Sequence, residues 1–421
     1  MSSLADRVRG IVKPSPVHGV GADLRVGPGG HTDPPSQDIE RTLGGEWRDG
    51  CFVVERRLPP ATRHGRETIG GMAQRLERSS PQATLFATGA PRPPFIFFDL
   101  ETTGLSGGAG TQAFLVGCGR FEDDGTFTTR QFMQSRGADE RTLLATVRAE
   151  LARAGAIVSF NGKSFDAPLL ETRYLFHRLE WARDDLAHVD VLHPARRFWG
   201  PDCSLIALEH RLLGRSRSGD VAGFEVPARY FRYVRTGDVQ PLVAVLDHNR
   251  QDLLTLAALA TRLLHLSHAG PADARDAAEA LGLGRTYARA GHDDRAREAF
   301  QRAVAMSRGP AGAFDAVRID SLRALALAWR RARRFDEAAQ CWRQLAEIRG
   351  CPPHIAREAA EALAIHHEHR VGDLAAARQF ALSSLEAEVP PAWTKAVQHR
   401  LARIDRKISE RPLAFFSSSQ S

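Results

Sequence analysis

An apolar run that ends in two carboxylates limits what this chain can be more than any other feature. Residues 95–102 read FIFFDLET, in which four large apolar side chains predict a buried strand that continues into Asp99 and Glu101. Side chains two positions apart on a strand point to the same face, so these two acids are expected side by side. Adjacent like charges are costly unless a cation lies between them. A solvated strand end, where acidic residues cost little, is the alternative.

The segments around this strand predict a mixed α/β domain over residues 95–268. Apolar runs bounded by turn residues indicate strands, and apolar residues at helical spacing indicate helices. We expect strands at 95–100, 113–121 and 126–134, then a helix at 139–155, a strand at 156–160, a helix at 164–179 and a strand at 187–193. This βββαβαβ order, followed by helices, resembles the α/β ribonuclease-H-like fold, a mixed five-stranded sheet with flanking helices.

The N-terminal part of the chain has a different composition. Residues 14–40 are rich in Pro, Gly and small polar residues, which predicts a flexible arm over residues 1–40. Residues 41–94 are expected to be a short accessory segment and linker. The pair Asp49-Gly50 before an apolar run predicts a small hairpin within that segment.

The C-terminal part predicts helices only. Three similar helical pairs follow residue 270, and the corresponding positions Gly291, Arg333 and Gly372 lie 42 and 39 residues apart. Tetratricopeptide units repeat about every 34 residues, so we expect stretched tetratricopeptide-like repeats over residues 270–410. An irregular helical bundle is the alternative.

Composition narrows the cellular setting and the class of partner. A chain of 421 residues suggests two or three domains. No apolar run approaches the roughly 18 residues that span a bilayer, so we expect a cytoplasmic protein without a membrane partner. Five scattered cysteines without a CxxC pair indicate neither a zinc site nor a disulfide framework. An excess of basic over acidic residues, 57 to 50, mildly favours a polyanionic partner.

Two polar positions lie in or beside the later strands. The segment SFNGKSFDAPLL places Asn161 and Lys163 in a turn and Asp166 at the start of a helix. An Asp at a helix start is usually only a cap, so a structural role for Asp166 is a strong alternative to a catalytic one. Asp190 lies inside an apolar strand, where a structural hydrogen bond and a catalytic role are equally plausible.

A helix near residue 250 supplies the last candidates. The segment LDHNRQDLLTL places His248 and Asp252 four residues apart, on one face of an amphipathic helix. A single His on such a face is more often a core or surface residue than a catalyst. Its spacing to an acid keeps the catalytic interpretation open.

Together these segments resemble the DEDD, or DnaQ-like, family of 3′-to-5′ exonucleases. The first family motif, DxE, corresponds to Asp99 and Glu101, and the second corresponds to Asn161, Phe165 and Asp166. In one branch of the family a tyrosine precedes the last Asp by four residues, and this chain has His248 there. The other branch uses histidine one residue further away. The chain therefore combines the two branches, which leaves the identity of the catalytic base open.

The chain is also similar to the YprB-like group of ribonuclease-H-like proteins. The stretches DLETTGLSGGAGTQAFLVG, FNGKSFDAPLL, DVLHPARRFWG and LDHNRQDLLTL carry this resemblance, which covers roughly residues 40–265.

The resemblance implies two divalent cations, Mg²⁺ or Mn²⁺, that flank one phosphate and are held by carboxylate oxygens. Asp99 would bridge both ions, Glu101 and Asp252 would complete one site, and Asp166 would support the other. His248 would orient or deprotonate the attacking water. The residues expected to contact the substrate are Thr102, Thr103, Leu105, Asn161 and Lys163.

We therefore expect a divalent-metal-dependent 3′-to-5′ exonuclease that hydrolyses single-stranded DNA or RNA. Its helical repeats would bind a protein partner or extend the nucleic-acid track. One alternative is a structure-selective endonuclease on the same fold. Another is a catalytically idle scaffold that recruits protein partners through the repeats, although such a scaffold has no need of four carboxylates.

Overall fold

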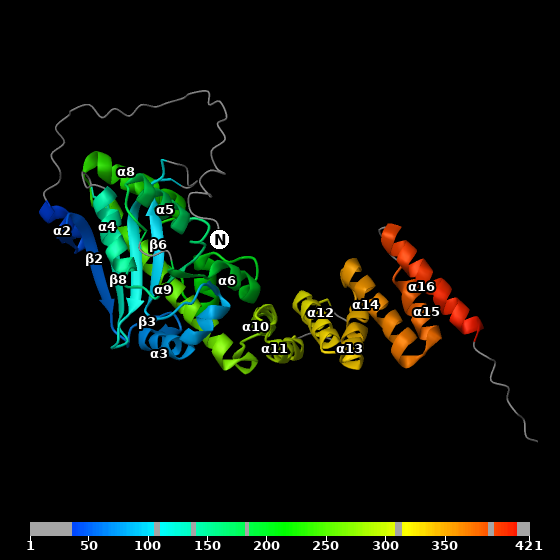
Figure 1. The fold of residues 1–421 in the computed structure, drawn as a ribbon. Helices are drawn as coiled ribbons and strands as arrows, with labels where there is room; N and C mark the ends of the chain where they lie inside the picture. Colours follow the sequence, from blue (N-terminus) through cyan, green and yellow to red (C-terminus); the bar gives the residue numbers. More distant parts are fainter. Residues whose placement is uncertain are drawn as a thin grey trace, which may run out of the picture.

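A mixed β-sheet and a row of helices make up the two regions of the molecule (Figure 1). The computed structural model describes residues 36–104, 110–135, 140–181, 185–307, 314–385 and 391–410. In these ranges the main sheet has eight strands. Along the sheet they are β1 (Glu46–Arg48), β2 (Cys51–Leu58), β8 (Phe127–Met133), β7 (Ala113–Phe121), β6 (Phe95–Thr102), β9 (Ala156–Ser159), β10 (Ala187–Asp190) and β5 (Ala87–Thr88).

The five expected strands are present, in the expected order. Strands β6, β7 and β8 form an antiparallel meander, whereas β9 pairs in parallel with both β6 and β10. Strand β6 is therefore central, with an antiparallel neighbour on one side and a parallel neighbour on the other. This arrangement confirms the ribonuclease-H-like fold class.

The sheet is wider than the five expected strands because the N-terminal segment joins it. The hairpin of β1 and β2 adds to the edge at β8, where Phe52, Val53 and Val54 are buried. At the other edge, β5 pairs with β10. Helix α2 (Ser36–Leu43) begins inside the expected flexible arm and buries Ile39 and Leu43 against this part of the core; residues 1–35 lie outside the described ranges.

Helices cover both faces of the sheet. On one face, α4 (Glu140–Leu151) and α5 (Asp166–Phe176) pack on Ile96, Phe98 and Leu100 of β6. On the other face, α9 (Gln240–Ala269) packs near Phe95 and Phe97. The same face also carries α3 (Ile69–Ser79), α6 (Leu192–Trp199), α7 (Leu205–Leu208) and α8 (Val226–Thr236), the turns η1 (Ser80–Leu85), η2 (Glu209–Leu213) and η3 (Gly223–Glu225), and the small hairpin of β3 (Arg63–His64) and β4 (Glu67–Thr68).

The second region is a succession of helices, each packed on the next (Figure 1). They are α10 (Ala277–Arg289), α11 (Asp293–Met306), α12 (Ala316–Arg331), α13 (Phe335–Ala346), α14 (Pro353–His366), α15 (Leu374–Ser383) and α16 (Pro391–Ser409), with the turns η4 (Pro271–Asp273) and η5 (His367–Val371). None of the described helices is long and apolar enough to cross a membrane.

The two regions share one hydrophobic core, which runs from the sheet through α9 into the helical row. Glu279 of α10 accepts hydrogen bonds from Trp199 Nε1 (3.1 Å) and from Arg262 Nε (3.2 Å). Gly282 lies so close to Phe198 that an added Cβ would come within 2.8 Å of that residue's Cα. Helices α10 and α6 are therefore in direct contact, and the boundary expected near residue 270 falls inside a continuous core.

Candidate active site

Strand β6 places Asp99 and Glu101 on the face of the sheet that α9 covers. Residues alternate between faces along a strand, so the acids share the side occupied by Phe95 and Phe97. The side-by-side placement expected from the sequence is confirmed, because Asp99 and Glu101 lie two residues apart in the regular part of β6, opposite Gly117 and Leu115 of β7. The two carboxylates therefore lie between the sheet and the long helix.

A buried amide fixes the orientation of Asp99. Asn249 of α9 donates from Nδ2 to Asp99 Oδ2 at 2.8 Å, and its own Oδ1 accepts a 3.0 Å bond from Gln131 Nε2. Gly117 lies opposite Asp99 on β7, and a Cβ there would come within 2.2 Å of Asn249 Oδ1. The missing side chain at Gly117 is what lets Asn249 reach the first carboxylate.

Asp166 and Asp190 border the site from helix α5 and from strand β10. Asp166 is buried in the first turn of α5, as the sequence indicates. Asp190 ends β10 and accepts three backbone N–H bonds, from Asn161 (2.9 Å), Lys163 (3.0 Å) and Leu192 (3.0 Å). These bonds give Asp190 a structural role, since it holds the turn that leads into Asp166.

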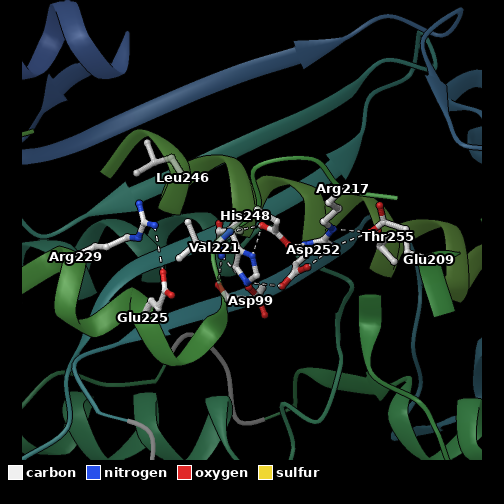
Figure 2. A network of polar contacts seen from close by, with 12 residues as sticks. Asp99, Glu209, Arg217, Val221, Glu225, Arg229, Leu246, His248, Asp252 and Thr255 are labelled. Carbon is white, nitrogen blue, oxygen red and sulfur yellow. Dashed lines mark hydrogen bonds and ion pairs between the residues drawn. The ribbon is translucent and has the colours of Figure 1, made fainter. Parts of the chain in front are cut away.

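Helix α9 presents His248 and Asp252 on one face, four residues apart. His248 Nε2 is 3.5 Å from Asp252 Oδ2 (Figure 2). The other ring nitrogen, Nδ1, is 2.7 Å from Oδ1 of Asp220. Arg217 lies beside them with a side chain only 3% exposed, and it donates to Asp252 Oδ1 at 2.6 Å. The same guanidinium binds Glu209 (2.7 Å) and Asp220 (3.2 Å). One buried cation thus links three acids at this end of the site.

Burial and mutual repulsion raise the pKa values of the clustered carboxylates. Burial raises the pKa of Asp99 well above its usual range, and the charges of the three other candidate ligands raise it further. Glu101 shows the same direction, again from burial first and then from the charges of Asp252 and Asp166. Burial and the charge of Asp190 raise the pKa of Asp166 to about 7. The candidate ligands therefore resist ionisation together unless positive charge is added.

Asp220 and Asp252 differ because each has basic partners. Burial opposes ionisation of Asp220, but the hydrogen bond and charge of His248 and the charge of Arg217 outweigh it, so its pKa is lowered. Burial raises the pKa of Asp252, and the charges of His248 and Arg217 only partly oppose this. Negative charge is thus balanced at Asp220 and left in excess around Asp99 and Glu101.

The five residues expected to contact the substrate have different surroundings. Thr102 donates from Oγ1 to the carbonyl of Gly104 (2.8 Å), and Thr103 Oγ1 accepts from the N–H of Gln112 (3.0 Å), so both hydroxyls shape the end of β6. The Asn161 side chain is exposed and that of Lys163 is half-buried. Leu105, the fifth expected contact, lies outside the described residues.

Three further residues of the site carried no recognisable sequence signal. Asn249 stands next to His248 in the HN pair but matches no expected role. Arg217 and Asp220 come from the segment RSRSGDVAG, which has neither strand nor helix periodicity. They also border a cavity of about 610 Å³ whose lining includes Ser204, His210 and Arg215.

The donor set suits a hard divalent cation, although its members are not yet gathered around one point. Among the described residues, no three His, Cys, Asp or Glu side chains converge closely enough to hold a metal ion as they stand. Carboxylate oxygens are nevertheless the ligands that Mg²⁺ and Mn²⁺ prefer. Asp99, Glu101 and Asp166 therefore fit such an ion in two ways. Their carboxylate oxygens are suitable ligands, and a bound cation would supply the positive charge that keeps all three ionised.

Two comparisons relate this geometry to known proteins. Residues 96–264 match the model of the RNase_H superfamily, a range that starts in β6 and ends in α9. The range contains every candidate ligand and His248. The chain is also 29% identical over 372 residues to the uncharacterized protein YprB of Bacillus subtilis (strain 168), across 85% of this chain and 86% of that protein. An alignment of that length extends beyond the range of the RNase_H superfamily match.

Proposed function

We propose that this chain is a divalent-metal-dependent nuclease, because residues 96–264 match the RNase_H superfamily, which points to a nuclease-type hydrolase. Its finer assignment is a 3′-to-5′ exonuclease on single-stranded DNA or RNA. The centre of the site is the set of Asp99, Glu101, Asp166 and Asp252.

The cluster of buried acids is the observation that supports this proposal most. Unpaired buried carboxylates cost stability, and a protein under no other demand gains by replacing them with apolar or paired residues. Here Glu101 and Asp166 are buried without an ion pair to another described residue, and their charges act on the half-buried Asp99. An idle scaffold has no use for such an arrangement, whereas a cation-binding centre requires it.

The protein's own groups would have distinct tasks. Asp99, Glu101, Asp166 and Asp252 would hold divalent cations, which when bound supply activation of water and charge stabilisation of the leaving oxygen. Asn249 keeps Asp99 oriented toward the site by its 2.8 Å hydrogen bond. His248, beside Asp252, would orient the attacking water and accept its proton.

The exonuclease assignment rests on the DEDD-like motifs rather than on the geometry alone. A structure-selective endonuclease could use the same four carboxylates. The helical row would act as tetratricopeptide-like repeats that bind a protein or guide the nucleic acid. Arg330, Arg331 and Arg333 at the turn between α12 and α13 support the second use, since they are exposed and form no ion pair with another described residue.

Product lengths test the proposal directly. The purified full-length chain is incubated with 5′-end-labelled single-stranded and duplex DNA and RNA in Mn²⁺, in Mg²⁺ and in chelator. An exonuclease acting from the 3′ end gives a ladder that shortens one nucleotide at a time, which a 3′-terminal phosphorothioate linkage slows. Early internal fragments from structured substrates would instead identify the endonuclease. Undegraded substrates in every metal condition would favour the scaffold.

A further inference from the structure

We propose that Asp220 is a positioning residue for His248, which it holds with the proton on Nδ1 and with Nε2 directed toward Asp252. The proposal rests on the function proposed above and adds a residue that neither the motifs nor the family resemblance identifies. Asp220 lies in the connection between η2 and η3, 28 residues before His248 in the chain.

The contact has the geometry of an oriented carboxylate–histidine pair. His248 Nδ1 and Asp220 Oδ1 are 2.7 Å apart, and the side chains are only 9% and 14% exposed. An ionised carboxylate can only accept, so the ring must donate from Nδ1. In the neutral ring, Nε2, which is 3.5 Å from Asp252 Oδ2, then carries the lone pair on the side of the candidate ligands.

Both carboxylate oxygens of Asp220 accept further hydrogen bonds that fix its orientation. Its Oδ1 also accepts from the N–H of Val221 (3.0 Å), while Oδ2 accepts from Nη1 of Arg217 (3.2 Å). Arg217 is anchored in turn by Glu209, whose side chain is 1% exposed and accepts a 2.8 Å bond from Thr255 of α9. Figure 2 shows this chain of contacts running along α9 to His248. The carboxylate is therefore oriented before any substrate arrives.

This orientation matters because a free imidazole prefers the opposite tautomer, with the proton on Nε2. A ring in that form cannot accept a proton at Nε2, so the wrong tautomer lowers turnover without removing the base. Asp220→Asn is the informative change, since its amide nitrogen can donate to Nδ1 and favour the Nε2–H form. We expect Asp220→Asn to lower kcat by about 10²- to 10³-fold, with smaller changes in KM and in Mn²⁺ affinity.

Two measurements on the full-length protein test the pair. Nitrogen-15 spectra of histidine-labelled protein report the tautomer of His248, whose signals are identified by their absence in His248→Gln. We expect the Nδ1–H form in the wild type and the Nε2–H form in Asp220→Asn. Asp238→Asn, at a half-exposed acid that accepts from Arg232 at 2.8 Å, is the matched control and should leave the His248 signals unchanged.

Kinetics then separate positioning from general structure. Because Asp220 acts through His248, Asp220→Asn should cost little in a His248→Gln background, whereas a merely structural residue would cost the same in both. A wild-type Nε2–H tautomer, or equal losses in the two backgrounds, would overturn the proposal. If Asp220→Asn does not fold, the wild-type tautomer decides alone. If the wild type hydrolyses no nucleic acid, the proposed function fails, while the spectra still decide whether Asp220 controls the ring.

Discussion

Asn249 Nδ2 and Asp99 Oδ2 are joined by a 2.8 Å hydrogen bond across the interface between α9 and the central strand. The amide is fully buried, and Gln131 fixes which way it faces by donating to Oδ1 at 3.0 Å. The bond ties the first carboxylate of the site to the helix that carries His248 and Asp252. The two halves of the candidate site are thus held together by a residue that is not itself a candidate ligand.

Gly117→Ala should break this link. The new Cβ would lie 2.2 Å from Asn249 Oδ1, so the amide must move away from Asp99. We expect a loss of about 1–3 kcal/mol in unfolding free energy and a marked loss of hydrolysis. Urea denaturation and a turnover assay measure the two effects. Gly223→Ala, at a glycine with open space around it, is the control, and equal behaviour of the two variants would refute this role for Gly117.

Arg217→Met should destabilise the fold. The change removes the guanidinium from Asp252 and leaves the buried Glu209 with only the half-buried Arg215, which costs about 3 kcal/mol. Arg285→Met, which removes the half-exposed 2.7 Å pair with Asp320, should cost no more than about 1 kcal/mol. Denaturation curves of the two variants in chelator give the comparison, and similar losses would show that the Arg217 network contributes no more than a surface pair.

Shortening the chain should be tolerated after α11 but not before α10. A chain ending at residue 270 lacks Glu279, which accepts from Trp199 and Arg262, and it uncovers the core beside Phe198. A chain ending at residue 307 keeps these contacts. We expect a clearly higher Tm for the longer form, together with detectable hydrolysis of short oligonucleotides. Equal Tm values would mean that the sheet region does not depend on α10.

His188 should make the protein sensitive to acid. Burial, followed by the charge of Lys163, lowers the pKa of this histidine from 6.5 to about 4. The unfolded chain therefore binds the extra proton first, so stability is lost as the pH falls from 6.5 toward 4, by up to about 3 kcal/mol. His188→Gln should lose less stability over that range in pH-dependent denaturation, while the exposed His268→Gln should follow the wild type. Parallel curves for all three proteins would contradict this.

Much of this fold could be predicted because its signals are local. The apolar run at the start of Phe95–Leu100 and the helical spacing around His248 are patterns within short segments, so the strand, the helix and the faces they present follow from those segments. Strand β5 escaped prediction because it is two residues long and is defined by its pairing with β10. Pairings of this kind depend on partners far away in the chain.

The same contrast between local sequence patterns and long-range contacts applies to the candidate site. Its DxE pair and the HxxxD spacing are short patterns that can be recognised in one segment. Asp220 and Arg217 act through contacts 28 and 35 residues away, from a loop without periodicity. Only the folded chain brings them to His248 and Asp252.

The central claim is that the buried carboxylates form a metal-dependent catalytic centre, and paired measurements on Asp99→Asn test it most directly. Mn²⁺ binding by titration calorimetry, thermal melts in chelator and turnover on a labelled oligonucleotide are compared for the wild type, Asp99→Asn and the control Asp238→Asn. We expect Asp99→Asn to lose Mn²⁺ binding and turnover while melting in chelator at an equal or higher temperature, because the repulsion it relieves is present only without metal. Wild-type turnover that persists in chelator, or Asp99→Asn with normal Mn²⁺ binding and turnover, would contradict the claim.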